Sequence, residues 1–219
     1  TGTAPATAPP QPAPDPNAAP DPAPNPLPPA WPVAQLVARL VAQNANLTNS
    51  DANSIATQCL WLTSKSGFDN PFTKCNSLPI FVSGVDVASA AMHDIQALER
   101  YPAWVLVHRE QSSIKPGSGW ASNLCPGKTS SQNCDEYPMF GMEEGGPAAT
   151  VYPDLLAIDA VENQRQGTRY SSFIAACSMK TGTSNPPGNS IGGDAFLGIP
   201  LPPSWGIPSI TNLCNGKTS

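Results

Sequence analysis

The chain has 219 residues, 27 of them proline, and a formal net charge of −5 at pH 7. Its length suits one ordinary globular domain, and it contains no apolar stretch long enough to span a membrane. The negative charge argues against tight, purely electrostatic binding of nucleic acid. It does not exclude an enzyme that meets a charged substrate with a metal ion and a few arginines.

The N-terminal segment differs in composition from the rest of the chain. Residues 1–32 hold 13 of the 27 prolines, and Ala, Thr, Asp and Asn fill most of the remaining positions. Such a segment cannot bury enough apolar surface to offset its conformational entropy. We therefore expect residues 1–32 to form a disordered, polyproline-like tether.

Two helices are expected after the tether. Apolar residues recur at helical spacing over residues 33–44, and Pro32 precedes them, a residue that suits the first turn of a helix. A second helix is expected to follow an N-cap at Ser50 or Asp51. These patterns define residues 33–78 as an N-terminal helical region.

The remaining residues, 79–219, mix strand and helix patterns and are expected to form one domain with a C-terminal extension. Residues 110–133 are rich in Gly, Ser, Pro and Asn and predict a loop. The pattern indicates an α+β fold, a small mixed domain that contains a ββα unit and carries N-terminal helices and a disordered Pro-rich segment. The expected strands lie at 79–83, 103–109, 137–142, 148–152 and 195–199, and the expected helices at 86–100 and 159–176.

The six cysteines indicate disulfides rather than a metal site, because they show neither a CxxC pair nor a Cys/His ligand spacing. An even number of cysteines is typical of an exported protein, so we expect a secreted, extracellular location. Spacing alone leaves several pairings open. The most local pairing joins Cys59 to Cys75 and Cys125 to Cys134, and leaves Cys177 with Cys214.

The most unusual stretch is residues 134–146, which read CDEYPMFGMEEGG. Its carboxylates repel one another unless water, a cation or a basic partner compensates, so the stretch predicts either a solvated loop or a metal and acid/base site. A polar run, residues 162–167, follows at the expected start of a helix, where anions are readily held. The carboxylates are Asp135, Glu136, Glu143 and Glu144.

The order of these motifs resembles the NucA/NucB deoxyribonuclease domain of secreted bacterial nucleases. Residues 135–139 match its DEYPM core and residues 143–146 match its EEGG motif. The (D/E)N motif and the Gly that follows it correspond to Glu162, Asn163 and Gly167.

Two residues upstream extend the resemblance. His93 in AMHDIQAL resembles the His on the family's helix, and Arg109 in WVLVHR resembles the Arg that ends its next strand. The similarity covers roughly residues 79–200. It implies that the ββα unit is nuclease-like and that the protein is a secreted, metal-dependent endonuclease that hydrolyses DNA phosphodiester bonds with little sequence specificity.

Hydrolysis needs a base for the attacking water and a cation at the scissile phosphate. We assign Asp135 as the catalytic base and Glu136 as a supporting or structural carboxylate of the catalytic site, because neighbouring strand residues point to opposite faces. A divalent ion, Mg²⁺ or Mn²⁺, is expected to be held by Glu144, Glu162 and Asn163.

Further candidates have less specific signals. Arg109 is expected to clamp a phosphate through its guanidinium. His93, Glu143 and Gln166 are possible additional site residues, although a single His on an amphipathic helix is more often a hydrogen-bonded core residue. DNA is the expected substrate, and a monomer that does not contact membranes is the expected state. The alternative is a non-enzymatic extracellular binding module whose acidic hairpin binds a cation or a partner.

Overall fold

The computed structural model describes residues 32–110, 125, 127–145, 153–185 and 189–215. Residues 1–31 of the predicted tether therefore lie outside the described residues. The helices of the described chain are α1 (Val33–Gln43), α2 (Asn49–Lys65), α3 (Pro71–Ser77), α4 (Ala88–Arg100) and α5 (Ala160–Ala176). Its short 3₁₀ turns are η1 (Val85–Val87), η2 (Pro102–Val105) and η4 (Pro203–Trp205). Its strands are β1 (Ile80–Ser83), β2 (Leu106–His108), β3 (Gln132–Tyr137), β4 (Asp154–Asp159), β5 (Thr183–Asn185), β6 (Asn189–Ile191), β7 (Ala195–Pro200) and β8 (Ile210–Leu213).

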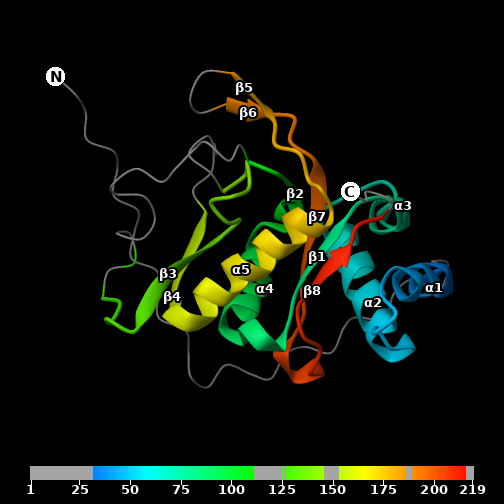
Figure 1. The fold of residues 1–219 in the computed structure, drawn as a ribbon, viewed down its shortest axis with the longest axis horizontal. Helices are drawn as coiled ribbons and strands as arrows, with labels where there is room; N and C mark the ends of the chain where they lie inside the picture. Colours follow the sequence, from blue (N-terminus) through cyan, green and yellow to red (C-terminus); the bar gives the residue numbers. More distant parts are fainter. Residues whose placement is uncertain (1–31, 111–124, 126, 146–152, 186–188, 216–219) are drawn as a thin grey trace.

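A four-stranded sheet with the order β2-β7-β1-β8 forms the centre of the molecule. β1 and β7 are parallel, whereas the two outer strands are antiparallel to their neighbours. Figure 1 shows α1, α2 and α3 on one side of this sheet and α4 and α5 on the other. Because helices cover both faces, every residue of β1 is buried, as expected for a strand without polar alternation.

The N-terminal helices share a hydrophobic core with the sheet. Leu36 and Leu40 of α1 are fully buried and pack in the same cluster as Ile80 and Leu197. The start of α2 differs slightly from the prediction, because the hydroxyl of Thr48 accepts the hydrogen bond from the amide of Asp51 and caps the helix.

The ββα unit is present, and the predicted α+β fold is confirmed. β3 and β4 pair antiparallel along their whole length, and α5 follows β4 directly. The Asp159 side chain caps α5 by accepting hydrogen bonds from the amides of Val161 and Glu162. In Figure 1, α4 and α5 lie between this hairpin and the central sheet.

Two predicted strands are wrong in their limits. The strand expected at 137–142 ends at Tyr137, because Pro138 has no amide to donate to a ladder, and the chain then turns. The strand expected at 103–109 begins with the 3₁₀ turn η2 after Tyr101, so only Leu106–His108 is extended. The strand expected at 148–152 lies outside the described residues.

The three local cysteine pairs are at disulfide distance, which confirms the predicted pairing. Two of the bonds attach flanking segments to the ββα unit. Cys134 lies on β3 and bonds to Cys125, and Cys177 caps the end of α5 and bonds to Cys214 after β8. No helix in the described part of the chain is long and apolar enough to cross a bilayer.

Truncating Leu40 tests whether α1 belongs to the core. Leu40→Ala removes a fully buried side chain, and such changes cost about 2–5 kcal/mol of unfolding free energy. Urea unfolding should show this loss, whereas Gln35→Ala, at an exposed position of the same helix, should leave the midpoint nearly unchanged. Equal midpoints for the two variants would contradict a shared core.

Candidate active site

A buried hydrogen bond joins α4 to the ββα unit. His93 Nδ1 lies 2.7 Å from Asp135 Oδ2. His93 is fully buried and Asp135 is only 2% exposed. Because Asp135 is on β3, this bond connects the hairpin to the helix that covers the sheet.

Asp94, which the sequence did not single out, completes a cluster with these two residues. Its Oδ2 accepts a hydrogen bond of 2.8 Å from Gln166 Nε2 on α5, and Ser83 Oγ at the end of β1 lies 3.4 Å away. One ligand atom from each of His93, Asp94 and Asp135 falls within 4.8 Å of the others. No other such group of three His, Cys, Asp or Glu side chains is found among the described residues.

Burial sets the electrostatics of this cluster. It raises the pKa of Asp94 well above its usual value, and the negative charge of Asp135 raises it further. Burial also raises the pKa of Asp135, while the hydrogen bond and the charge of His93 act in the opposite direction. The two buried carboxylates therefore resist simultaneous ionisation unless a cation compensates them.

Glu136 is the carboxylate of the DEYPM motif that reaches solvent. It is partly exposed, whereas its neighbours Asp135 and Tyr137 are buried. Partial burial, and secondarily the charge of Asp135, raise the pKa of Glu136 to about 7. The alternation of β3 thus gives one motif two carboxylates in different surroundings.

The (D/E)N motif lies against the same strand. Asn163 Nδ2 donates a 3.0 Å hydrogen bond to the backbone oxygen of Cys134, the residue before Asp135. Glu162 Oε2 accepts a 2.7 Å hydrogen bond from the amide of Ser89, in the first turn of α4. Both side chains therefore fix the start of α5 against β3 and α4.

The EEGG motif is held by the end of β2 instead. Glu144 Oε1 lies 2.5 Å from His108 Nδ1, and its Oε2 accepts a 2.9 Å hydrogen bond from the His108 amide. Glu143 Oε1 accepts a 2.9 Å hydrogen bond from the amide of Gly193. Glycine is required at position 145, since a Cβ there would lie 1.9 Å from the carbonyl oxygen of Pro138.

Arg109 lies near this second group. Its Nη1 is 3.4 Å from the carbonyl oxygen of Gly141, and its guanidinium sits 5.8 Å from the ring centroid of Tyr170. Tyr170 is one helical turn beyond Gln166 on α5, so Arg109 borders the same face of that helix as the buried cluster.

The structure therefore divides the predicted residues into two groups. The first group surrounds β3, α4 and the start of α5, and the second gathers at the end of β2. In the described part of the chain, Glu144, Glu162 and Asn163 bond to different partners. That these three side chains share one cation stays a prediction. The first group contains His93, Asp135, Glu136, Glu162, Asn163 and Gln166, and the second Arg109, Glu143 and Glu144.

Sequence reasoning missed Asp94 and Ser83. The available signal for Asp94 was a charged residue directly after His93, within a helix whose other inward positions are apolar or small. Ser83 carried no signal, because a serine at the end of a strand is common.

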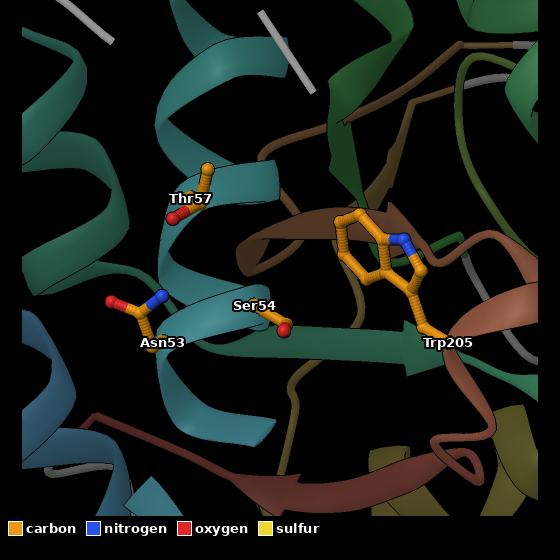
Figure 2. Close-up of a pocket in the computed structure, with 4 residues that line it drawn as sticks. All are labelled: Asn53, Ser54, Thr57 and Trp205. Carbon is orange, nitrogen blue, oxygen red and sulfur yellow. The ribbon is translucent and has the colours of Figure 1, made fainter. Parts of the chain in front are cut away.

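A surface groove of about 370 Å³ lies elsewhere, between α2 and η4. Asn53, Ser54, Thr57 and Trp205 line it, and none of these side chains titrates. Figure 2 shows Ser54 pointing towards the indole of Trp205, whereas Asn53 and Thr57 project on the other side of α2. These side chains do not converge on one point, so the groove lacks the features of a hydrolytic site.

The His108–Glu144 contact predicts a pH-dependent contribution to stability. The hydrogen bond that His108 donates to Glu144 raises the pKa of His108. The contribution of this contact to stability is therefore complete below the ordinary pKa of His and is lost as the pH rises through the raised value. Melting curves from about pH 5 to about pH 9 should show Glu144→Gln below the parent at low pH, with a gap that narrows at high pH. Glu99→Gln, at an exposed position, should follow the parent throughout.

Comparison with known proteins found one family match. Residues 102–185 match the family model described as Deoxyribonuclease NucA/NucB. No curated protein and no solved structure matches the chain. The matched range contains β3, β4 and α5, with Asp135, Glu136 and Asn163, whereas His93 and Asp94 precede it. The match covers part of the chain and is consistent with a NucA/NucB deoxyribonuclease domain over residues 102–185.

Proposed function

We propose that this protein is an exported, metal-dependent endonuclease that hydrolyses DNA with little sequence preference. The family match supports a deoxyribonuclease role. One structural observation carries the proposal further, namely the buried His93–Asp135 pair beside the partly exposed Glu136 in a ββα unit. Nothing in the sequence resembles a known base-reading motif, which favours cleavage without sequence preference.

Glu136 is the better placed of the two motif carboxylates to take a proton from the attacking water. A base must contact solvent or substrate, and Asp135 is buried with one oxygen bonded to His93. This proposal exchanges the roles that the sequence alone suggested. Asp135 then has a supporting role next to Glu136 on β3, and the hydrogen bond to His93 fixes the orientation of the Asp135 carboxylate.

A divalent cation fits the buried cluster by the chemistry of its donors. His93 Nε2 and Asp94 Oδ1 are buried and have no hydrogen-bond partner among the described residues, and an imidazole with two carboxylates is a common set of metal ligands. His93, Asp94 and Asp135 would hold the cation. When bound, it would supply positive charge to offset the charge that develops on the phosphate.

Arg109 is the proposed phosphate contact. Its guanidinium is partly buried, lies over Tyr170 and borders the α5 face that also carries Gln166. A guanidinium held in this way can donate two parallel hydrogen bonds to phosphate oxygens. Asn163 fixes the start of α5 against β3 and thereby keeps Glu136 at a constant position relative to the helix.

Export is supported by the three disulfides, which persist in oxidising compartments. The alternative function is a non-enzymatic extracellular binding module that uses the same acidic cluster. The net charge of −5 favours that alternative, because a DNA-binding surface is usually basic.

Digestion of supercoiled plasmid DNA tests the proposed activity. Purified protein should cut the plasmid in the presence of a divalent cation, and an excess of chelator should abolish cutting because the phosphate charge is no longer offset. Mn²⁺, Zn²⁺, Co²⁺ and Mg²⁺ are each tried separately. Absence of cutting with all four would favour the binding module.

Carboxylate variants test the assignment of roles. Glu136→Gln removes the base and should lower the cleavage rate by about 10² to 10⁴ without lowering the melting temperature. Asp69→Asn is the matched control, since Asp69 is exposed and distant in sequence from both motifs. Full activity of Glu136→Gln would show that Glu136 is not the base.

A further inference from the structure

We infer that His93, Asp94 and Asp135 form an enclosed site that selects a first-row transition-metal cation, such as Zn²⁺ or Co²⁺, over Mg²⁺ and Ca²⁺. The inference deepens the proposed function, since it names the class of cation for the same site. It is nevertheless tested by binding, so it does not depend on whether the protein cleaves DNA.

The donor set is the first argument. One of the three donors is an imidazole nitrogen, and the other two are carboxylate oxygens. Imidazole suits Zn²⁺, Co²⁺ and Ni²⁺, whereas Mg²⁺ and Ca²⁺ are bound almost entirely by oxygen. A site for Mg²⁺ or Ca²⁺ would be expected to place a carbonyl, carboxylate or water where His93 stands.

The burial of the donors is the second argument. His93, Asp94 and Asp135 are 0%, 1% and 2% exposed. Mg²⁺ dehydrates reluctantly and usually keeps several waters when it binds protein. An enclosed site with three protein donors therefore favours a cation that accepts a low coordination number, as Zn²⁺ does.

Two buried polar atoms without hydrogen-bond partners are the third argument. Gln166 and Ser83 both lie on Oδ2 of Asp94, which leaves Oδ1 buried without a described partner. His93 Nε2 is also buried without one. Buried polar atoms are nearly always paired, so two orphaned atoms in one cluster indicate a missing ligand.

The charge of the cluster is the fourth argument. In the described part of the chain, neither Asp94 nor Asp135 forms an ion pair with a Lys or Arg side chain. Buried carboxylates normally pair with a cation or coordinate a metal. Gln166, which bonds to Asp94 from α5, then acts as a positioning residue that holds the ligand in place.

Binding can be followed on the whole protein without DNA. Co²⁺ should produce a visible absorption band when it enters the site, and Zn²⁺ should displace it. Either ion should raise the melting temperature, while Mg²⁺ at the same concentration should not. Asp94→Asn should abolish the band, and Gln166→Ala should weaken Co²⁺ affinity by about 10- to 100-fold.

The chain has only two histidines, so the imidazole that binds the cation can be identified unambiguously. In protein labelled with ¹⁵N-histidine, Zn²⁺ should shift the imidazole nitrogens of His93 and leave those of His108 unchanged. His108→Gln identifies the resonances of His108 and serves as the matched control, because its partner Glu144 belongs to the second group. This measurement needs no variant of the cluster, so misfolding of His93→Gln cannot obscure it.

Three results would overturn the inference. These are equal stabilisation by Mg²⁺ and Zn²⁺, a Zn²⁺-dependent shift of His108 alone, or a Co²⁺ band that survives Asp94→Asn. Plasmid cleavage supported by Mg²⁺ without Zn²⁺ binding would refute this inference and leave the proposed nuclease intact. Zn²⁺ binding without cleavage by any tested cation would refute the nuclease and leave the site intact.

Discussion

The hydrogen bond between His93 and Asp135 is a buried polar contact between α4 and the β3–β4 hairpin. The central sheet with its helices forms one packed body, and the β3–β4 hairpin forms a second sheet that shares no strand with it. Apolar contacts from α4 and α5 bring the two together, but a nonpolar surface alone does not fix a register. A buried polar bond does, because its donor and acceptor lose water and regain a partner in only one arrangement.

The same burial is compatible with the phosphodiester-hydrolysing site that we propose for this acidic protein. The carboxylates do not gather on one open surface, where they would repel DNA. Asp94 and Asp135 are enclosed, Glu144 is paired with His108, and Glu162 caps the first turn of α4. Only Glu136 in the DEYPM motif retains partial access to solvent. In the proposed mechanism, hydrolysis would depend on this accessible carboxylate and on the charge of a cation held by the buried cluster.

The disulfides reinforce this arrangement. Cys134 is the residue directly before Asp135, and its bond to Cys125 fixes the strand where Asn163 also contacts the backbone. Cys177 at the end of α5 is bonded to Cys214, so the helix that carries Gln166 is anchored at its far end to the segment after β8. Covalent links therefore hold β3, which carries Asp135, and α5, which carries Gln166, whereas α4 with His93 and Asp94 has no cysteine and is held by noncovalent contacts.

The sequence by itself determined the features that depend on neighbours along the chain. Helical spacing located α1, α4 and α5, and the motif order predicted the ββα unit and the deoxyribonuclease family. Short separations predicted two of the disulfides, and the third joins the two cysteines that remained. Only the tertiary structure decided which carboxylates are buried, that Asp94 joins His93 and Asp135, and that Glu144 pairs with His108. These contacts join residues about 30 or more positions apart or depend on burial, and local periodicity carries no record of either. The limits of β3 belong to the same class, since Gln132–Tyr137 has no apolar alternation and is extended because β4 pairs with it.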